Sequence, residues 1–163
     1  MGIIKRLYPD YIYQSVHTIE ADFFKDNNIK YVVLDIDNTL VPYTVKTPTK
    51  PAMDFLRRLE SEGIKYCFLS NNNQKRVMLF NDNINAPYEA NARKPFVRGF
   101  NRILKQIGAK KPETLIIGDQ IFTDVWTGKR AGVRAMLVDP IEDKETLFFR
   151  FKRALEKIVL RAG

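Results

Sequence analysis

The chain has 163 residues and 45% hydrophobic content, enough for one well-packed core but too short for two ordinary domains, so we expect a single domain over residues 1–163. A lone cysteine excludes an intrachain disulfide, and the lack of a long apolar segment for membrane spanning or secretion predicts a cytoplasmic protein. The net charge of +8, from 27 Lys and Arg against 19 Asp and Glu, suggests an anionic substrate, nucleic acid or an acidic membrane surface as partner.

Residues 1–30 mix aromatic and basic side chains, and we expect an irregular lead-in with a short helix near residues 18–27. The next stretch, Tyr31–Leu34, is an apolar run typical of a strand buried on both faces of a parallel sheet. Asp35 and Asp37 follow this strand. Because an ionised carboxylate is costly in an apolar setting unless its charge is offset, we expect a metal ion beside this pair.

After a polar, proline-containing connection, the chain alternates between helical and extended patterns. Apolar residues at helical spacing predict a helix over residues 51–62, closed by Gly63, and an apolar run predicts a strand over residues 64–69. That strand ends at Ser70 and Asn71, which begin a polar run that can cap the next helix.

The second half of the chain repeats this design. After a loop from residue 81, Lys94 precedes Pro95, and a proline suits the first turn of a helix that ends near residue 107. The remaining expected elements are a strand over residues 114–119, a helix over 121–131, a strand over 134–138 and a turn at 139–140. This alternation predicts an α/β fold, namely a doubly wound, Rossmann-like parallel sheet with helices on both faces.

Polar residues at the expected strand ends are suited to phosphate chemistry. Ligands bind such sheets beyond the carboxyl ends of the strands, so Asp35, Asp37, Ser70 and Asp119 are expected to converge. Carboxylates without His or Cys ligands select a hard cation, with Mg²⁺ as the default. Lys94 adds a positive charge suited to phosphate. Phosphoryl transfer needs such positioning and charge neutralisation, and a carboxylate can itself be the nucleophile.

Four motifs resemble, in their order, those of the haloacid dehalogenase (HAD) superfamily of phosphatases: Asp35-Ile-Asp37-Asn-Thr39, Ser70-Asn71, Lys94-Pro95 and Gly118-Asp-Gln-Ile-Phe-Thr-Asp124. The resemblance implies that Asp35 is the nucleophile and a Mg²⁺ ligand. It implies that Asp37 protonates the leaving group, then activates water, and also binds the metal through its carbonyl. Asp119 is implied as the remaining protein ligand of the metal.

The same resemblance assigns roles to the other motif residues. Ser70 and Lys94 are implied to hold the transferring phosphoryl group, with Thr39 and Asn71 also on the substrate. Asp124 is implied to support either the metal or Lys94. An acidic residue in the first turn of a helix also simply complements the helix dipole, which makes Asp124 the least specific of these assignments.

Closer still, the sequence resembles the YqeG family of small bacterial HAD phosphatases, through these motifs together with Leu7-Tyr8-Pro9 and Ala92-Arg-Lys-Pro95. That family is similar to the mitochondrial phosphatidylglycerophosphate phosphatases of cardiolipin synthesis, which implies phosphatidylglycerophosphate as the leading substrate. The gaps between motifs, residues 40–70 and 71–94, leave no room for a cap domain. The expected open site suits a phosphate on something large, such as a lipid headgroup or a macromolecule.

The tail, residues 144–163, carries half of the net charge, since six basic residues against two acidic ones give +4. Its apolar residues share one stripe of an expected helix, at Phe148, Phe151, Leu155 and Ile158. We interpret it as a closing helix of the sheet with a solvated basic face. A compatible alternative rests that face on anionic lipid, which places the protein peripherally on the inner face of the membrane.

The main prediction is a Mg²⁺-dependent phosphomonoesterase, and three alternatives stay open. A nucleotide or nucleic-acid-end phosphatase is favoured by the positive charge, although the chain has no recognised nucleic-acid-binding motif. A receiver-type phospho-acceptor switch uses similar residues, but an acid/base at Asp37 favours turnover over a lasting acyl phosphate. The third alternative is a binding scaffold that keeps the fold without catalysis.

Overall fold

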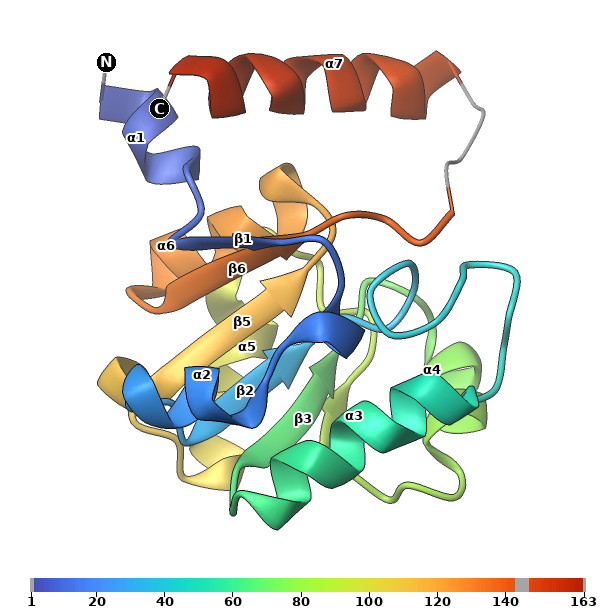
Figure 1. Cartoon of the computed structure of the whole chain (residues 1–163). Coiled ribbons are helices and arrows are strands. Elements are labelled where there is room, and N and C mark those ends of the chain that lie inside the picture. Colours follow the sequence, from blue (N-terminus) through green and yellow to red (C-terminus); the bar gives the residue numbers. More distant parts are fainter. Residues whose placement is uncertain (1, 143–146, 163) are drawn as a thin grey trace.

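The structure, a computed structural model, describes residues 2–142 and 147–162, with side chains of the second segment from Arg153 onward. Six parallel strands form one sheet (Figure 1) in the spatial order β1-β6-β5-β2-β3-β4. The strands are β1 (Tyr11–Tyr13), β2 (Tyr31–Leu34), β3 (Lys65–Leu69), β4 (Tyr88–Glu89), β5 (Thr114–Gly118) and β6 (Arg134–Val138). The predicted doubly wound parallel sheet is confirmed.

Helices connect these strands and cover both faces of the sheet (Figure 1). The helices are α1 (Gly2–Leu7), α2 (Ala21–Asp26), α3 (Lys50–Ser61), α4 (Gln74–Asn81), α5 (Val97–Ile107), α6 (Trp126–Ala131) and α7 (Leu147–Ala162). Short turns add η1 (Val16–Thr18), η2 (Lys111–Glu113) and a π-helical turn, η3 (Ile121–Val125). Among the described helices, none combines the length and apolar character required to cross a membrane.

Alternating side chains of the buried strands explain the two layers of helices. Val32 and Leu34 pack in a core with apolar residues of α2, α3 and α4, whereas Val33 between them packs with α5, α6 and Leu7 of α1. Because neighbouring residues of a strand point to opposite faces, an uninterrupted apolar run buries both. Val159 of α7 packs in the same core as Val33, so this helix lies on the same face of the sheet as α5 and α6.

The strand order places β2 at the switch point of the sheet. Its neighbours are β3 on one side and β5 on the other, so the chain winds outward in both directions from this position. Leu34 lies in register with Phe68 and Ile117, and the amide of Asp35 donates to the Ile117 carbonyl at 3.1 Å. The residues after β2, β3 and β5 therefore emerge together at the crevice where such sheets bind ligands. Within the described residues, no separate cap domain covers it.

The structure corrects the expectation of an irregular lead-in over residues 1–30. Besides α1 and α2, this segment supplies β1, an edge strand whose Tyr11 lies in register with Met136 of β6. A two-residue strand, β4, also lies in the stretch expected to be a loop. Such short edge strands carry too few residues for an apolar pattern, and pairing with a long neighbour defines them instead.

The expected helix start at Pro95 is also wrong. Helix α5 begins at Val97, after Phe96 in an extended conformation. The reason lies in Lys94, whose main-chain N–H and C=O both bond to the side-chain amide of Asn71, so they are unavailable to a helix. For the predicted C-terminal helix, α7 is present, but Phe148 and Phe151 of its expected stripe lie outside the described side chains.

Candidate active site

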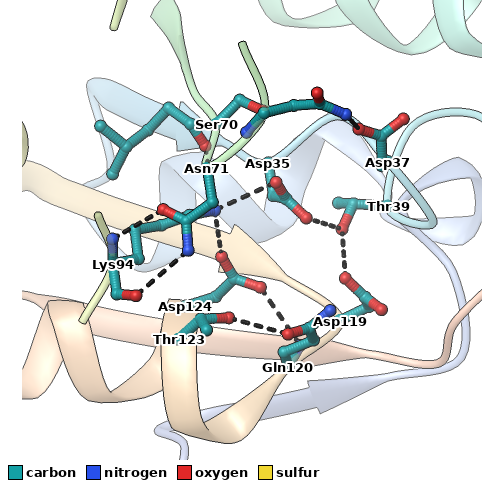
Figure 2. A network of polar contacts seen from close by, with 12 residues as sticks. Asp35, Asp37, Thr39, Ser70, Asn71, Lys94, Asp119, Gln120, Thr123 and Asp124 are labelled. Carbon is teal, nitrogen blue, oxygen red and sulfur yellow. Dashed lines mark hydrogen bonds and ion pairs between the residues drawn. The ribbon is translucent and has the colours of Figure 1, made fainter. Parts of the chain in front are cut away.

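A polar pocket of about 300 Å³ lies at the carboxyl ends of the central strands. It is lined by Asp35, Asp37, Asn38, Tyr43, Ser70, Asn71, Asn72, Lys94, Gln120 and Thr123. Figure 2 shows that residues from the ends of β2, β3 and β5 and from the segment before α5 point toward one another here. Of the four residues expected to converge, Asp35, Asp37 and Ser70 line this pocket, and Asp119 lies directly behind it.

Three carboxylates behind and within the pocket approach one another closely. Asp35, Asp119 and Asp124 each offer an oxygen, and these atoms all lie within 4.8 Å of one another. The buried hydroxyl of Thr39 lies 3.3 Å from both Asp35 Oδ2 and Asp119 Oδ1. Thr39 therefore connects two of the carboxylates, a contact that the sequence analysis did not anticipate for a residue expected on the substrate.

Lys94 balances part of this negative charge. Its Nζ lies 3.0 Å from Asp35 Oδ1 and 2.5 Å from Asp124 Oδ1, and it also donates to the Leu69 carbonyl at 3.0 Å. Burial alone would lower the pKa of Lys94, but the carboxylates of Asp124 and Asp35 outweigh it, so the pKa is raised and the amine stays charged. The amide of Asn71 fixes the Lys94 main chain and thereby aims this side chain.

The surroundings of Asp35 and Asp119 disfavour the ionised form of both carboxyl groups. Burial, followed by the charges of Asp124 and Asp119, raises the pKa of Asp35 well above its ordinary value, although Lys94 opposes the shift. Burial and Asp124 likewise raise the pKa of Asp119 to about 6, against the opposing effect of Arg153. A divalent cation would offset this excess charge, and a set of carboxylate oxygens without sulfur or imidazole fits the hard ion Mg²⁺. Asp35, Asp119 and Asp124 are the side chains that could hold it.

Asp124 reaches the cluster from the π-helical turn η3, which starts shortly after the end of β5. Its Oδ2 accepts a hydrogen bond from the Gln120 amide at 3.2 Å, and its carboxyl group packs on Gly118 so closely that a Cβ there would overlap it. The turn η3 thus carries Asp124 within it and continues directly into α6. The glycine of the fourth motif is thus a steric requirement for the position of Asp124.

The Asp37 carboxylate turns away from the three other carboxylates. Arg76 of α4 donates to its Oδ1 at 2.8 Å, and the Asn72 side chain donates to its Oδ2 at 3.2 Å. Arg76 also donates to the carbonyls of Val45 and Lys46, which ties the loop before α3 to the same carboxylate. The metal-ligand role expected for Asp37 concerned its main-chain carbonyl and stays a prediction.

Sequence reasoning missed several residues of this site. Asn72 belongs to the polar run that was expected to cap a helix, whereas Arg76 gave no signal beyond its charge. Arg153 of α7 donates to Asp119 Oδ2 at 3.0 Å and was expected to be solvated. Ser70, by contrast, was predicted: it lines the pocket, and its Oγ accepts a hydrogen bond from the main-chain amide of Asn72 at 3.0 Å. Long side chains from distant helices cannot be assigned to a site from spacing alone.

The sheet and its carboxylate pocket are those of a haloacid dehalogenase-like hydrolase, and the sequence profile of that family matches residues 43–132. The protein named "Probable phosphatase YqeG" from Bacillus subtilis (strain 168) is 34% identical over 161 residues, which cover 98% of this chain and 94% of that protein. The chain therefore belongs to the HAD superfamily of hydrolases, in the YqeG family.

Solved structures share the fold. The cobalt-bound deoxy-D-mannose-octulosonate 8-phosphate phosphatase (YrbI) from Haemophilus influenzae has a TM-score of 0.56 at 15% identity, over 83% of this chain and 90% of that one. A haloacid dehalogenase-like hydrolase from Brucella suis 1330 has a TM-score of 0.53 at 12% identity, over 79% of this chain and 98% of that one. At such low identities the likeness concerns the architecture.

Proposed function

We propose that this hydrolase is a Mg²⁺-dependent phosphomonoesterase in which Asp35 attacks phosphorus. The exposure of the three clustered carboxylates carries the proposal. The side chain of Asp35 is 12% exposed and lines the pocket, whereas those of Asp119 and Asp124 are 0% and 2% exposed. A nucleophile must reach the substrate, while a metal ligand need not. Asp35 is therefore the reacting group, with Asp119 and Asp124 behind it.

The pocket residues supply the remaining steps. An Asp35 oxygen forms a bond to phosphorus while the bond to the leaving alcohol breaks, giving an aspartyl phosphate, and Asp37 delivers a proton to the departing oxygen. Asp37 then takes a proton from water, which attacks the aspartyl phosphate and releases inorganic phosphate. Lys94 and Ser70 hold the phosphoryl oxygens throughout. A Mg²⁺ ion held by Asp35, Asp119 and Asp124 would neutralise charge on those oxygens.

The leading substrate is phosphatidylglycerophosphate, presented by a membrane. Resemblance to the YqeG family supports this choice, as does a pocket that no cap encloses in the described part of the chain. Exposed apolar and basic residues on two neighbouring helices are also suited to an anionic lipid surface: Ile3 and Lys5 of α1, and Leu155, Lys157, Ile158 and Arg161 of α7. We therefore propose a cytoplasmic enzyme that binds peripherally at the inner face of the membrane.

A phosphate-release assay tests both the reaction and its substrate. Wild type and Asp35→Asn are compared on vesicles containing phosphatidylglycerophosphate, on 5′-phosphorylated oligonucleotides and on a soluble aryl phosphate, each with Mg²⁺ or with chelator. We expect Mg²⁺-dependent release from the vesicles by wild type and none by Asp35→Asn, with circular dichroism confirming that the variant folds. Preference for the oligonucleotides would overturn the lipid substrate, and equal activity of Asp35→Asn would overturn the mechanism.

A further inference from the structure

Two side chains of the C-terminal helix hold the loop that carries Asp119. Arg153 donates through Nη2 to Asp119 Oδ2 at 3.0 Å and through Nη1 to the Asp119 carbonyl at 2.8 Å. Glu156, one helical turn further along α7, accepts the amide of Ile121 at 3.0 Å. Arg153 therefore holds the first residue of the loop between β5 and η3, and Glu156 holds the residue that directly follows this loop.

Arg153 and Glu156 also bind each other. Arg153 Nη1 lies 2.9 Å from Glu156 Oε2, and the Glu156 side chain is 5% exposed. Because the buried Glu156 carboxylate offsets the charge of the guanidinium, the pair adds little net positive charge beside Asp119. Beyond its charge, Arg153 constrains the geometry of Asp119, since the planar guanidinium binds the carbonyl and the carboxylate of one residue in a fixed orientation.

We propose that Arg153, with Glu156, is a positioning residue for the metal site. By holding Asp119 Oδ2, Arg153 leaves Oδ1 on the side of Thr39 and Asp35, where the carboxylates converge. Partners that orient a ligand in this way typically govern metal affinity about 10- to 100-fold. The C-terminal helix is then a functional part of the site, although the family profile ends at residue 132.

The direction in which substitutions of Arg153 change Mg²⁺ affinity distinguishes an orienting role from an effect of its positive charge. If the guanidinium acted chiefly as a positive charge, it would repel a cation at Asp119, and its removal would tighten metal binding. If it acts by orientation, its removal loosens metal binding. A lysine at position 153 keeps the charge but loses the planar fork, so Arg153→Lys separates the two effects.

The test measures Mg²⁺ binding to the full chain by isothermal titration calorimetry, without substrate. We expect Arg153→Lys, Arg153→Gln and Glu156→Gln each to weaken Mg²⁺ binding by about 10- to 100-fold. Arg161→Lys and Arg161→Gln are the matched controls, because Arg161 is an exposed arginine of the same helix, and both should bind as wild type does. Thermal unfolding checks that each variant is folded. If Arg153→Gln does not fold, the more conservative Arg153→Lys still provides the measurement.

A second readout separates positioning from a folding defect. Excess Mg²⁺ should restore the kcat of Arg153→Lys to near the wild-type value, because the pocket itself is intact and only the cation requirement has risen. Unchanged affinity in Arg153→Lys, or tighter binding in Arg153→Gln, overturns the proposal. The inference rests on the proposed metal dependence, but calorimetry distinguishes a failure of the positioning role from a failure of the phosphatase proposal. A wild type that binds Mg²⁺ without releasing phosphate refutes the phosphatase proposal. Weakened Mg²⁺ binding by the variants still supports the positioning role in that case.

Discussion

The two walls of the pocket handle charge differently. We call inner wall the cluster of Asp35 and Lys94, which line the pocket, with Asp119 and Asp124 behind them. It sets three carboxylates against one lysine, with the arginine of α7 already paired to a glutamate. The outer wall, formed by Asp37, Asn72 and Arg76, sets one carboxylate against one guanidinium. The inner wall has surplus negative charge, and the outer wall is balanced.

This difference indicates how the two proposed tasks are divided. A surplus of buried carboxylate is costly unless a cation joins it, so the inner wall is suited to binding metal and to holding the nucleophile beside that metal. The balanced outer wall needs no cation, and its ion pair instead fixes where the Asp37 carboxylate lies. Changes to the inner wall should therefore affect metal binding, whereas changes to the outer wall should affect the proton-transfer steps and leave metal affinity near the wild-type value.

Replacing Lys94 should have the largest effect. Lys94→Met leaves Asp35 and Asp124 without their shared partner, and breaking a buried ion pair costs about 3–5 kcal/mol. The lost contact with the phosphoryl oxygens should also lower kcat by about 10²- to 10³-fold. Thermal unfolding and aryl phosphate hydrolysis measure the two effects.

Lys50→Met is the control for the stability change. Lys50 forms an ion pair with Asp54, but its side chain is 84% exposed, and exposed pairs contribute about 0–1 kcal/mol. Mg²⁺ should recover part of the stability lost in Lys94→Met, because a bound cation takes over the neutralisation of the carboxylates. Equal losses in the two variants would show that the inner wall carries no surplus charge of consequence.

On the outer wall, Arg76→Gln should reduce turnover less severely. The substitution removes one of the two side chains that hold the Asp37 carboxylate, leaving Asn72, and releases the carbonyls of Val45 and Lys46. Since general acid catalysis contributes about 10²- to 10⁴-fold, misplacing the acid should cost about 10- to 100-fold in kcat. Mg²⁺ affinity measured by calorimetry should stay near the wild-type value, in contrast to changes on the inner wall.

The leaving group provides a sharper version of this experiment. p-Nitrophenolate departs without protonation, whereas an alkoxide needs a proton, so Arg76→Gln should slow the release of an alkyl alcohol more than that of p-nitrophenolate. Arg57→Gln, which changes an exposed arginine of α3, is the matched control and should alter neither rate. An equal slowing of both substrates would contradict the assignment of Asp37 as the acid.

The inner wall was largely predictable from the sequence, and the physical reason is local. Asp35 and Asp119 follow directly after apolar strands, and in a parallel sheet the position of a strand end is set by the strand. Gly118 was named only as part of the fourth motif, and its steric role comes from the structure, where Asp124 packs against it. The fold followed from the same alternation of strands and helices.

Unlike Asp37 itself, the residues that hold Asp37 and the contacts of α7 were not predictable in this way. Arg76 and Arg153 reach their carboxylates from helices distant in sequence, and a long flexible side chain carries no local mark of its direction. Edge strands β1 and β4 were missed because pairing with a neighbour, rather than a sequence pattern, defines them. Groups at strand ends and in the four motifs were thus indicated by the sequence, whereas the arginines that helix packing places at the site were missed.

The smallest expected effect is a pH dependence of the thermal unfolding temperature, caused by the surplus of buried carboxylates in the inner wall. Burial is the main reason why the pKa of Asp119 is raised from the ordinary 3.8 to about 6. Between these two pH values the folded chain holds a proton on Asp119 that the unfolded chain has released. In chelator, the stabilising contribution of this group is complete below pH 3.8 and is lost as the pH rises through about 6. The resulting fall in Tm should be on the order of 5 °C.

Mg²⁺ should reverse this loss, because the cation and the proton compete for the same carboxylates. The rise in Tm caused by Mg²⁺ should therefore be small at pH 5 and larger at pH 7. Asp119→Asn cannot ionise at this position, so its Tm in chelator should change less between pH 4 and 6 than that of wild type. Parallel Tm profiles of the two proteins in chelator would mean that Asp119 is stably ionised without metal, and that the inner wall is balanced by groups other than a cation.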